Sequence, residues 1–154
     1  MSLTTYRFAE PFDADALHEL LLEMHAEMSF FPLAEAKGHA KIVEILERGA
    51  CLLCEHDGVL IGSIGLLPVQ LWYTESWMMA DAWTFITKKH RKSRVAIEML
   101  KRIKEFCVRA GLPLAMAVVS PHEAERKNTL YRRYLTPVGE MYMEFPDGFP
   151  VRKR

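Results

Sequence analysis

A run of basic residues between an apolar stretch and an amphipathic segment carries the clearest chemistry in this chain. Five cationic side chains lie close together in it: Lys88, Lys89, Arg91, Lys92 and Arg94. The first amides of a helix have no acceptor within that helix, and the helix dipole favours a negative charge at the same end. A helix that begins at Val95 would therefore offer a site for a phosphate or pyrophosphate. A solvated basic turn is the alternative interpretation of the loop taken alone.

The residues on both sides of the basic loop predict the elements that position it. Apolar residues follow the loop at helical spacing: Ala96, Ile97, Leu100, Ile103, Phe106 and Cys107. Gly111 is a typical residue for the end of such a helix. Residues 77–86 are rich in aromatic and β-prone side chains, residues 112–119 form a short apolar run, and each predicts a strand. The order is thus strand, cationic loop, helix and strand.

The rest of the chain predicts further strands and helices in one α/β (α+β) fold. The expected strands are 6–10, 50–55, 59–67 and 140–145, and the expected helices begin after Asp13, near 33 and at 123. Asp13 is the predicted N-cap of the first helix, and Asp57-Gly58 predicts a hairpin turn. No linker or repeat is visible, so 1–154 is expected to form a single domain with 146–154 as a loose tail.

Composition and charge argue against several classes of protein. Half of the 154 residues are hydrophobic, which is enough to bury a core without metal or disulfide support. Twenty basic and twenty acidic residues give zero net charge, which argues against a general nucleic-acid binder. Cys51 and Cys54 would point to opposite faces of one strand, so no metal or redox site is predicted. Free thiols, no signal segment and no long apolar run favour a cytoplasmic protein without membrane contact.

The order of elements, with the basic loop between the fourth strand and the third helix, resembles the GNAT superfamily of acyl-CoA-dependent N-acetyltransferases. The resemblance covers nearly the whole chain and favours a phage-type or bacterial member. The cofactor motif of this family, R/Q-x-x-G-x-G/A, matches at Arg91 and Ala96, while Arg94 replaces the middle glycine. The resemblance implies a mixed sheet of about six to seven strands, about four helices, and a cofactor cleft where the fourth and fifth strands splay.

By this resemblance, acetyl-CoA would be the cosubstrate. The residues expected to contact it are Phe85, Ile86, Arg91, Lys92, Ser93, Arg94, Val95, Ala96 and Asn128. Backbone amides near Phe85 and Ile86 would stabilise the oxyanion that develops during transfer. Asn128 would contact the pantetheine arm of the cofactor.

Tyr131, three residues after Asn128, is the expected general acid toward the departing thiolate. The family segment N-x-x-x-Y-x-x-x-G-F suggests the role, although the pair here has a shorter spacing and Leu135-Thr136 stands in place of Gly-Phe. A tyrosine with its ordinary pKa of about 10 is protonated at neutral pH and is able to donate. A helix tyrosine packed on a sheet is the structural alternative.

Asp81 is the candidate general base, because it is an acid within an otherwise uncharged predicted strand. A carboxylate in that position must be paired, solvated or functional. A sheet-edge carboxylate facing solvent is the alternative. Weaker candidates for the base are Glu75, His25 and His122.

The expected activity is therefore transfer of an acetyl group from acetyl-CoA to a small-molecule or peptide amine, directly and within a ternary complex. A homodimer is possible for such a fold. The alternative is a GNAT-like protein that binds CoA or another nucleotide without catalysis, and the arginine in place of glycine motivates it.

Overall fold

The computed structural model describes residues 1–119 and 124–149, and its elements follow the predicted order as far as the last helix. The strands are β1 (Thr4–Phe8), β2 (Ala50–His56), β3 (Val59–Val69), β4 (Met78–Ile86) and β5 (Leu114–Ala115). The α-helices are α1 (Ala14–Met28), α2 (Glu35–Arg48), α3 (Val95–Ala110) and α4 (Ala124–Tyr134). Two short 3-10 helices are η1 (Pro11–Asp13) and η2 (Lys88–His90).

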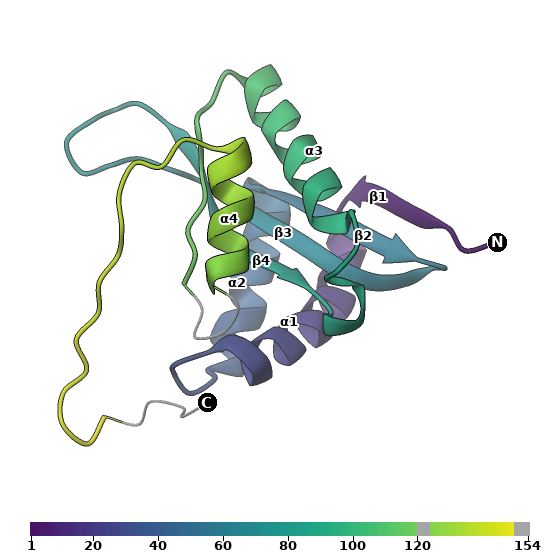
Figure 1. Ribbon diagram of the computed structural model, residues 1–154, viewed down its shortest axis with the longest axis horizontal. Helices are drawn as coiled ribbons and strands as arrows, with labels where there is room; N and C mark the ends of the chain where they lie inside the picture. Colours follow the sequence, from purple (N-terminus) through teal and green to yellow (C-terminus); the bar gives the residue numbers. More distant parts are fainter. Residues whose placement is uncertain (120–123, 150–154) are drawn as a thin grey trace.

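The five strands form one sheet in the order β1-β2-β3-β4-β5. The neighbours from β1 to β4 are antiparallel, whereas β4 and β5 are parallel. Helices α1 and α2 cover one face of the sheet, and α3 and α4 lie on the other (Figure 1). One apolar layer joins the sheet to α3 through Met99 and Ile103, and the other joins it to α1 and α2 through Leu17 and Ile45. The fold is thus an α+β sandwich with the sheet in the middle.

The cysteines of β2 follow the alternation expected of a strand. Cys51 packs in the layer of α1 and α2, and Cys54 packs in the layer of α3. The turn after β2 also agrees with its prediction, since Asp57 and Gly58 both have positive φ, 50° and 80°. That pair of angles is the one that a two-residue hairpin turn requires. At the far end of α3, Gly111 has φ 70° and ends the helix as predicted.

Strand β4 contains one extra residue opposite β3. Gly65 pairs with Trp83 and Leu66 pairs with Asp81, so Ala82 has no partner in β3. An inserted residue reverses the alternation of side chains between the two faces. Trp83 therefore joins the α1–α2 layer, where it covers Gly65 so closely that a Cβ there would lie 2.5 Å from the indole ring.

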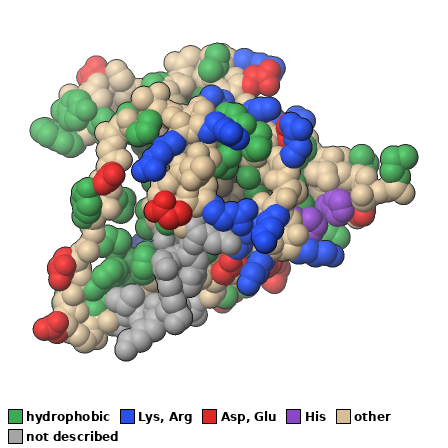
Figure 2. All heavy atoms as spheres, viewed as in Figure 1, with side chains coloured by type: hydrophobic (Ala, Val, Ile, Leu, Met, Phe, Trp, Pro, Cys, Tyr) green, Lys and Arg blue, Asp and Glu red, His purple; other side chains and the backbone are tan. Residues whose placement is uncertain are grey.

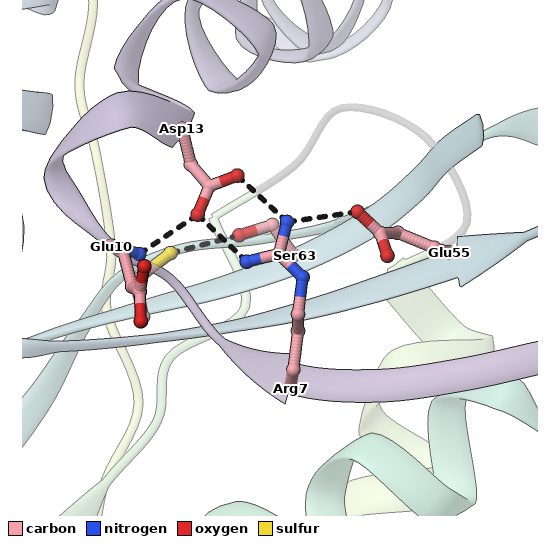
Figure 3. A network of polar contacts seen from close by, with 6 residues as sticks. Arg7, Glu10, Asp13, Glu55 and Ser63 are labelled. Carbon is pink, nitrogen blue, oxygen red and sulfur yellow. Dashed lines mark hydrogen bonds and ion pairs between the residues drawn. The ribbon is translucent and has the colours of Figure 1, made fainter. Parts of the chain in front are cut away.

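The start of α1 is held by a polar cluster instead of the predicted N-cap bond. Asp13 precedes α1, but its side chain makes no capping hydrogen bond to the helix. Its two carboxylate oxygens accept hydrogen bonds from the Arg7 guanidinium at 2.8 Å each, and one of them also accepts the Glu10 amide at 2.8 Å. Arg7 donates a further bond to Glu55 of β2 at 2.9 Å (Figure 3). Bidentate, charge-assisted bonds to Arg7 are stronger than one bond to a helix amide, which explains the difference.

The prediction of six to seven strands was wrong, because the described residues form five. No strand forms over residues 140–145, where Met141 and Tyr142 are exposed, and β5 covers two residues of the expected 112–119. The alternation of side chains is a property of the segment itself. A strand also needs a neighbouring sheet edge with free N–H and C=O groups. The short β5 offers too little edge for a sixth strand.

The described end of the chain returns to the connection between α1 and α2. The ring of Phe145 lies 5.7 Å from that of Phe30, and the ring of Phe149 lies 5.7 Å from that of Phe31. A turn follows Phe145, in which the Phe149 amide donates to the Pro146 carbonyl at 3.0 Å. The first residues of the predicted tail 146–154 thus pack on another segment, and 150–154 lie outside the described residues.

Within residues 1–119 and 124–149, no helix combines the length and the apolar character needed to cross a membrane.

Candidate active site

A cavity of about 220 Å³ lies where β4 and β5 separate. Strand β5 pairs only with Met79 and Ala80 of β4. From Asp81 onward, β4 therefore has no strand beside it on that side among the described residues. The end of β4, the first turns of α3, helix α4 and Met28 of α1 line the cavity.

The backbone of β4 turns alternate residues toward the cavity. The Thr84 carbonyl accepts a hydrogen bond from Lys127 Nζ at 3.3 Å, and the Ile86 carbonyl accepts one from Arg91 Nε at 2.8 Å. The Thr87 amide instead donates to β3, at the Ile61 carbonyl. Since the N–H and C=O of one strand residue point the same way, the Ile86 amide faces the cavity and the Phe85 amide faces β3. Of the two amides predicted near the oxyanion, only that of Ile86 has the required direction.

Arg91 of the predicted phosphate loop is engaged by protein groups. Its guanidinium donates to both carboxylate oxygens of Glu27 in α1, with Nη2 2.7 Å from Oε2. The guanidinium also lies 5.3 Å from the centre of the Phe85 ring, and 10% of the Arg91 side chain is exposed. Together with the bond to the Ile86 carbonyl, these contacts tie the loop to α1 and to β4. The sequence motif carries no sign of Glu27, because that residue lies 64 positions earlier.

The first turn of α3 begins at the mouth of the cavity. Ser93 Oγ accepts the Val95 amide at 3.3 Å and donates to the His90 carbonyl at 2.5 Å. The amides that follow, those of Ala96 and Ile97, belong to the helix positions without an intrahelical acceptor. Ser93, Ala96 and Ile97 line the cavity. The positive end of the α3 dipole therefore points toward this opening.

The remaining loop residues differ in their surroundings. Val95 is buried in the layer between α3 and the sheet, and Lys92 is exposed. The Arg94 side chain is 81% exposed and lies 3.8 Å from Glu98. Figure 2 shows Lys and Arg side chains gathered on the face that carries α3, α4 and the loop before α3. The mouth of the cavity is therefore electropositive.

A polar cluster forms on β4 around the extra residue Ala82, where Thr84 lines the cavity and Asp81 lies beside it without lining the cavity itself. Asp81 Oδ1 accepts the Ala117 amide at 3.1 Å, and Asp81 Oδ2 accepts the Thr84 hydroxyl at 3.3 Å. Residues three apart in a regular strand face opposite sides, so the extra residue is what brings Asp81 and Thr84 together. Burial raises the pKa of Asp81, while the bonds from Ala117 and Thr84 and the charge of Lys127 oppose that rise.

Tyr131 of α4 completes this cluster from the opposite wall. The residue is 9% exposed and lines the cavity. Among the described residues, its hydroxyl has no hydrogen-bond partner of acceptable geometry, although the Thr84 hydroxyl is near enough to lower its pKa. Burial is the dominant effect and, with the nearby Asp81 charge, raises the pKa of Tyr131 to about 12. A buried hydroxyl without a partner is unusual and calls for a physical explanation.

The other predicted candidates lie apart from this cluster. Asn128 is half-buried on α4 but does not line the cavity, and Glu75 is exposed in the connection between β3 and β4. His25 Nε2 bonds the Phe31 carbonyl at 2.8 Å. His122 lies outside the described residues. Within the described residues, no group of three or more His, Cys, Asp or Glu side chains could hold a metal ion.

The cavity residues that the sequence did not assign to the site include Thr84, Lys127 and Met116. Helical spacing could have found Lys127, because it precedes Tyr131 by four residues and shares its helix face. Thr84 could not be placed without the position of the extra residue in β4. Met116 follows β5, and no motif or pattern in the sequence marks it as a cavity residue.

No family profile and no curated protein matches this sequence. Solved structures do resemble it in fold. A predicted acetyltransferase with acetyl-CoA from Clostridium acetobutylicum matches with a TM-score of 0.74 and 12% identity, over 94% of this chain and 96% of that chain. A GCN5-related N-acetyltransferase from Ralstonia eutropha JMP134 matches with a TM-score of 0.69 and 16% identity, over 93% and 99% of the two chains.

A third structure of similar fold was solved with a bisubstrate analog that includes an acetylated amine. The aminoglycoside acetyltransferase AAC(6')-Iy, in complex with the bisubstrate analog CoA-S-monomethyl-acetylneamine, matches with a TM-score of 0.71 and 16% identity, over 99% of both chains. All three comparisons cover nearly the full length of both partners at low sequence identity. This chain therefore has the fold of the GNAT-family N-acetyltransferases.

Proposed function

We propose that this protein is an N-acetyltransferase that moves the acetyl group of acetyl-CoA directly to an amine. The observation that carries the proposal is the Tyr131 hydroxyl, which is buried on the cavity wall and has no hydrogen-bond partner within residues 1–119 and 124–149. A ligand group that accepts its hydrogen bond would remove the cost of that buried donor. The thiolate sulfur released from a thioester is such an acceptor.

The cofactor would enter at the positive end of α3. The phosphates of acetyl-CoA suit the amides of Ala96 and Ile97 and the surrounding cations, while its pantetheine arm suits the largely apolar cavity beyond. Arg94 is free of tight packing and can turn toward a phosphate. Arg91, in contrast, would support the loop from beneath through its bonds to Glu27 and Ile86.

The two titratable groups of the cluster suit the two proton transfers of the reaction. Tyr131, with a pKa raised to about 12, is fully protonated at neutral pH and would protonate the departing thiolate. Asp81, with its raised pKa, would be a better proton acceptor for the amine than an ordinary aspartate. The Ile86 amide, which faces the cavity, would stabilise the oxyanion.

Direct transfer is favoured over a covalent acyl-enzyme. Cys51, Cys54 and Cys107 are all buried in the core, and none of them lines the cavity. Burial raises the pKa of both Cys51 and Cys54 to about 11, so neither is a thiolate at neutral pH. The acceptor would be a small-molecule or peptide amine, in line with the neamine analog bound by the aminoglycoside acetyltransferase of similar fold.

The test combines a binding and a turnover measurement on the same preparation. Acetyl-CoA should bind the protein by calorimetry, and random duplex DNA, titrated in parallel, should not. A panel of amines that includes aminoglycosides, polyamines and peptide N-termini is then screened for acetyl-CoA-dependent thiol release. Release above the amine-free control supports the proposal. Tight binding of acetyl-CoA without release for any amine would instead favour the non-catalytic CoA-binding alternative.

A further inference from the structure

Thr84 lies between the two groups proposed to move protons, and the inference drawn from it rests on the proposed function. The extra residue in β4 places Thr84 on the same face as Asp81, and its hydroxyl donates to Asp81 Oδ2 at 3.3 Å. The same hydroxyl lies beside Tyr131 on the cavity wall. One side chain thus adjoins both proton-transfer groups.

Burial creates a problem for Tyr131 after each turnover. Once Tyr131 has protonated the thiolate, it remains as a tyrosinate in a site that is 9% exposed and close to the Asp81 carboxylate. Desolvation and a neighbouring negative charge both make that anion unfavourable. Bulk water has poor access to a residue buried to this degree. A proton donor within the cluster would restore Tyr131 faster than solvent.

We propose that the Thr84 hydroxyl relays to Tyr131 the proton that Asp81 takes from the amine. The amine nitrogen forms its bond to the acetyl carbon, the carbon–sulfur bond breaks, and Tyr131 gives its proton to the sulfur. Asp81 accepts the proton lost by the nitrogen. Thr84 then donates its hydroxyl proton to the tyrosinate and receives the proton held by Asp81. The net result is one proton moved from amine to thiol, with all three side chains returned to their starting states.

The geometry around Asp81 allows this path. The Ala117 amide occupies Oδ1 at 3.1 Å, so the carboxylate is held in place while Oδ2 faces Thr84. A carboxylate has about four lone-pair sites, so Asp81 can still accept a proton from the incoming amine. Lys127 faces the cluster from α4, where it bonds the Thr84 carbonyl and its charge lowers the pKa of Asp81. Apo hydrogen bonds in such sites are often long and shorten only in the reactive complex, as the 3.3 Å bond from Thr84 would.

The test compares three variants of Thr84 that differ in whether the hydroxyl is present and in the size of the side chain. Thr84→Val keeps the shape of the side chain and removes the hydroxyl, Thr84→Ser keeps the hydroxyl, and Thr84→Ala removes the hydroxyl with a smaller side chain. Melting temperature and acetyl-CoA affinity are measured first for each. Then kcat, KM and the pH dependence of kcat/KM are measured with the best amine found for the wild type.

The relay predicts that Thr84→Val and Thr84→Ala lose roughly 10- to 100-fold in kcat, less than the loss from removing a direct general acid, with acetyl-CoA affinity unchanged. Thr84→Ser should recover most of the rate. Because the Thr84 bond lowers the pKa of Asp81, the acidic limb of the profile should move to higher pH in the hydroxyl-free variants and stay in place in Thr84→Ser.

Two results would overturn the relay while leaving the enzyme proposal intact. One is wild-type kcat and an unmoved acidic limb in whichever hydroxyl-free variant folds. The other is an equal loss in Thr84→Ser and Thr84→Val, which would show a packing role. A wild type without transfer to any amine would instead overturn the proposed function, and the relay with it.

Discussion

The Arg7 cluster at the start of α1 and the Tyr131 cluster beside the cavity each contain a buried polar side chain, Asp13 in one and Tyr131 in the other, but they differ in how those polar atoms are satisfied. Both oxygens of Asp13 accept bonds from Arg7, and Glu55 takes a further one (Figure 3). The Tyr131 hydroxyl, buried to a similar degree, has no such partner among the described residues. A closed cluster stabilises the fold, whereas an open one is suited to a ligand.

The contrast predicts opposite effects of removing one group from each cluster. In the open cluster the effect should fall on turnover, and in the closed cluster it should fall on stability.

The largest effect is expected from Tyr131→Phe, which keeps the ring and removes only the hydroxyl. Turnover should fall by roughly 10²- to 10⁴-fold, the usual contribution of a positioned general acid. Unfolding free energy should stay the same or rise slightly, because the hydroxyl that is removed is buried and bonds to none of the described residues. Single-turnover acetyl transfer and urea denaturation measure the two quantities. Tyr134→Phe, on the same helix, is the matched control and should leave both near wild type.

The next effect is expected from Arg7→Met, which breaks the closed cluster. Of the partners of Asp13 in the described part of the chain, only the Glu10 amide would remain, so unfolding free energy should fall by about 2–3 kcal/mol. Arg48→Met is the control, because the Arg48 side chain is 67% exposed and pairs with Glu44 at 3.5 Å on the surface. Its change should stay within about 0.5 kcal/mol. Both Arg7→Met and Arg48→Met should retain acetyl transfer when it is measured at a temperature where they are folded.

The same pair gives stability a defined dependence on pH. The Arg7 guanidinium holds the pKa of Asp13 below its usual value. The stabilisation is therefore complete above the ordinary carboxyl pKa, near pH 4, and is lost as the pH falls through the lowered value. Urea denaturation between about pH 6 and pH 2.5 should show a steeper acid loss in the wild type than in Arg7→Met. Parallel curves would mean that Asp13 has no special role in acid stability.

A smaller effect is expected from Glu27→Gln, which removes the charge that faces Arg91. Unfolding free energy should fall by about 1–2 kcal/mol, since Arg91 is largely buried and would lose its charged partner. Glu23→Gln, one turn earlier and exposed, should be neutral. Equal stability of Glu27→Gln and Glu23→Gln would contradict the bracing role given to Arg91. It would also return Arg91 to the list of candidate phosphate ligands.

The smallest effect is expected from Arg94→Glu at the mouth of the cavity. The side chain is 81% exposed and lies 3.8 Å from Glu98, so the fold should be unaffected. Acetyl-CoA affinity should weaken by roughly 3- to 10-fold, about 1 kcal/mol, and more strongly at low salt. Lys101→Glu, further along α3 and also close to Glu98, makes the same change of charge away from the cavity. Calorimetry at two salt concentrations compares the acetyl-CoA affinities of the two variants.

Much of the fold could be predicted from the sequence, because a whole buried face leaves a repeating pattern. The stripe from Val95 to Cys107, Gly111 at the end of α3 and the Asp57-Gly58 turn are local features of this kind. A sixth strand over 140–145 was predicted from the same kind of pattern and was wrong. A pattern shows that a segment can form a strand, but it does not show that a sheet edge is available.

The site could be predicted only in part, for a related reason. Tyr131 was predicted from the family resemblance and Asp81 from its place in an uncharged strand, and both lie close to Thr84 in the structure. That arrangement depends on one extra residue, Ala82, which has no mark in the sequence. The partner of Arg91 was equally hidden, because an ion pair across 64 residues leaves no periodicity.

The most direct test of the open cluster is a crystal structure of the protein with CoA bound. The account predicts that the sulfur of CoA lies within hydrogen-bonding distance of Tyr131 Oη, with the pantetheine arm along the free side of β4 and the phosphates at the first turn of α3. CoA bound elsewhere, with Tyr131 still without a partner, would contradict it.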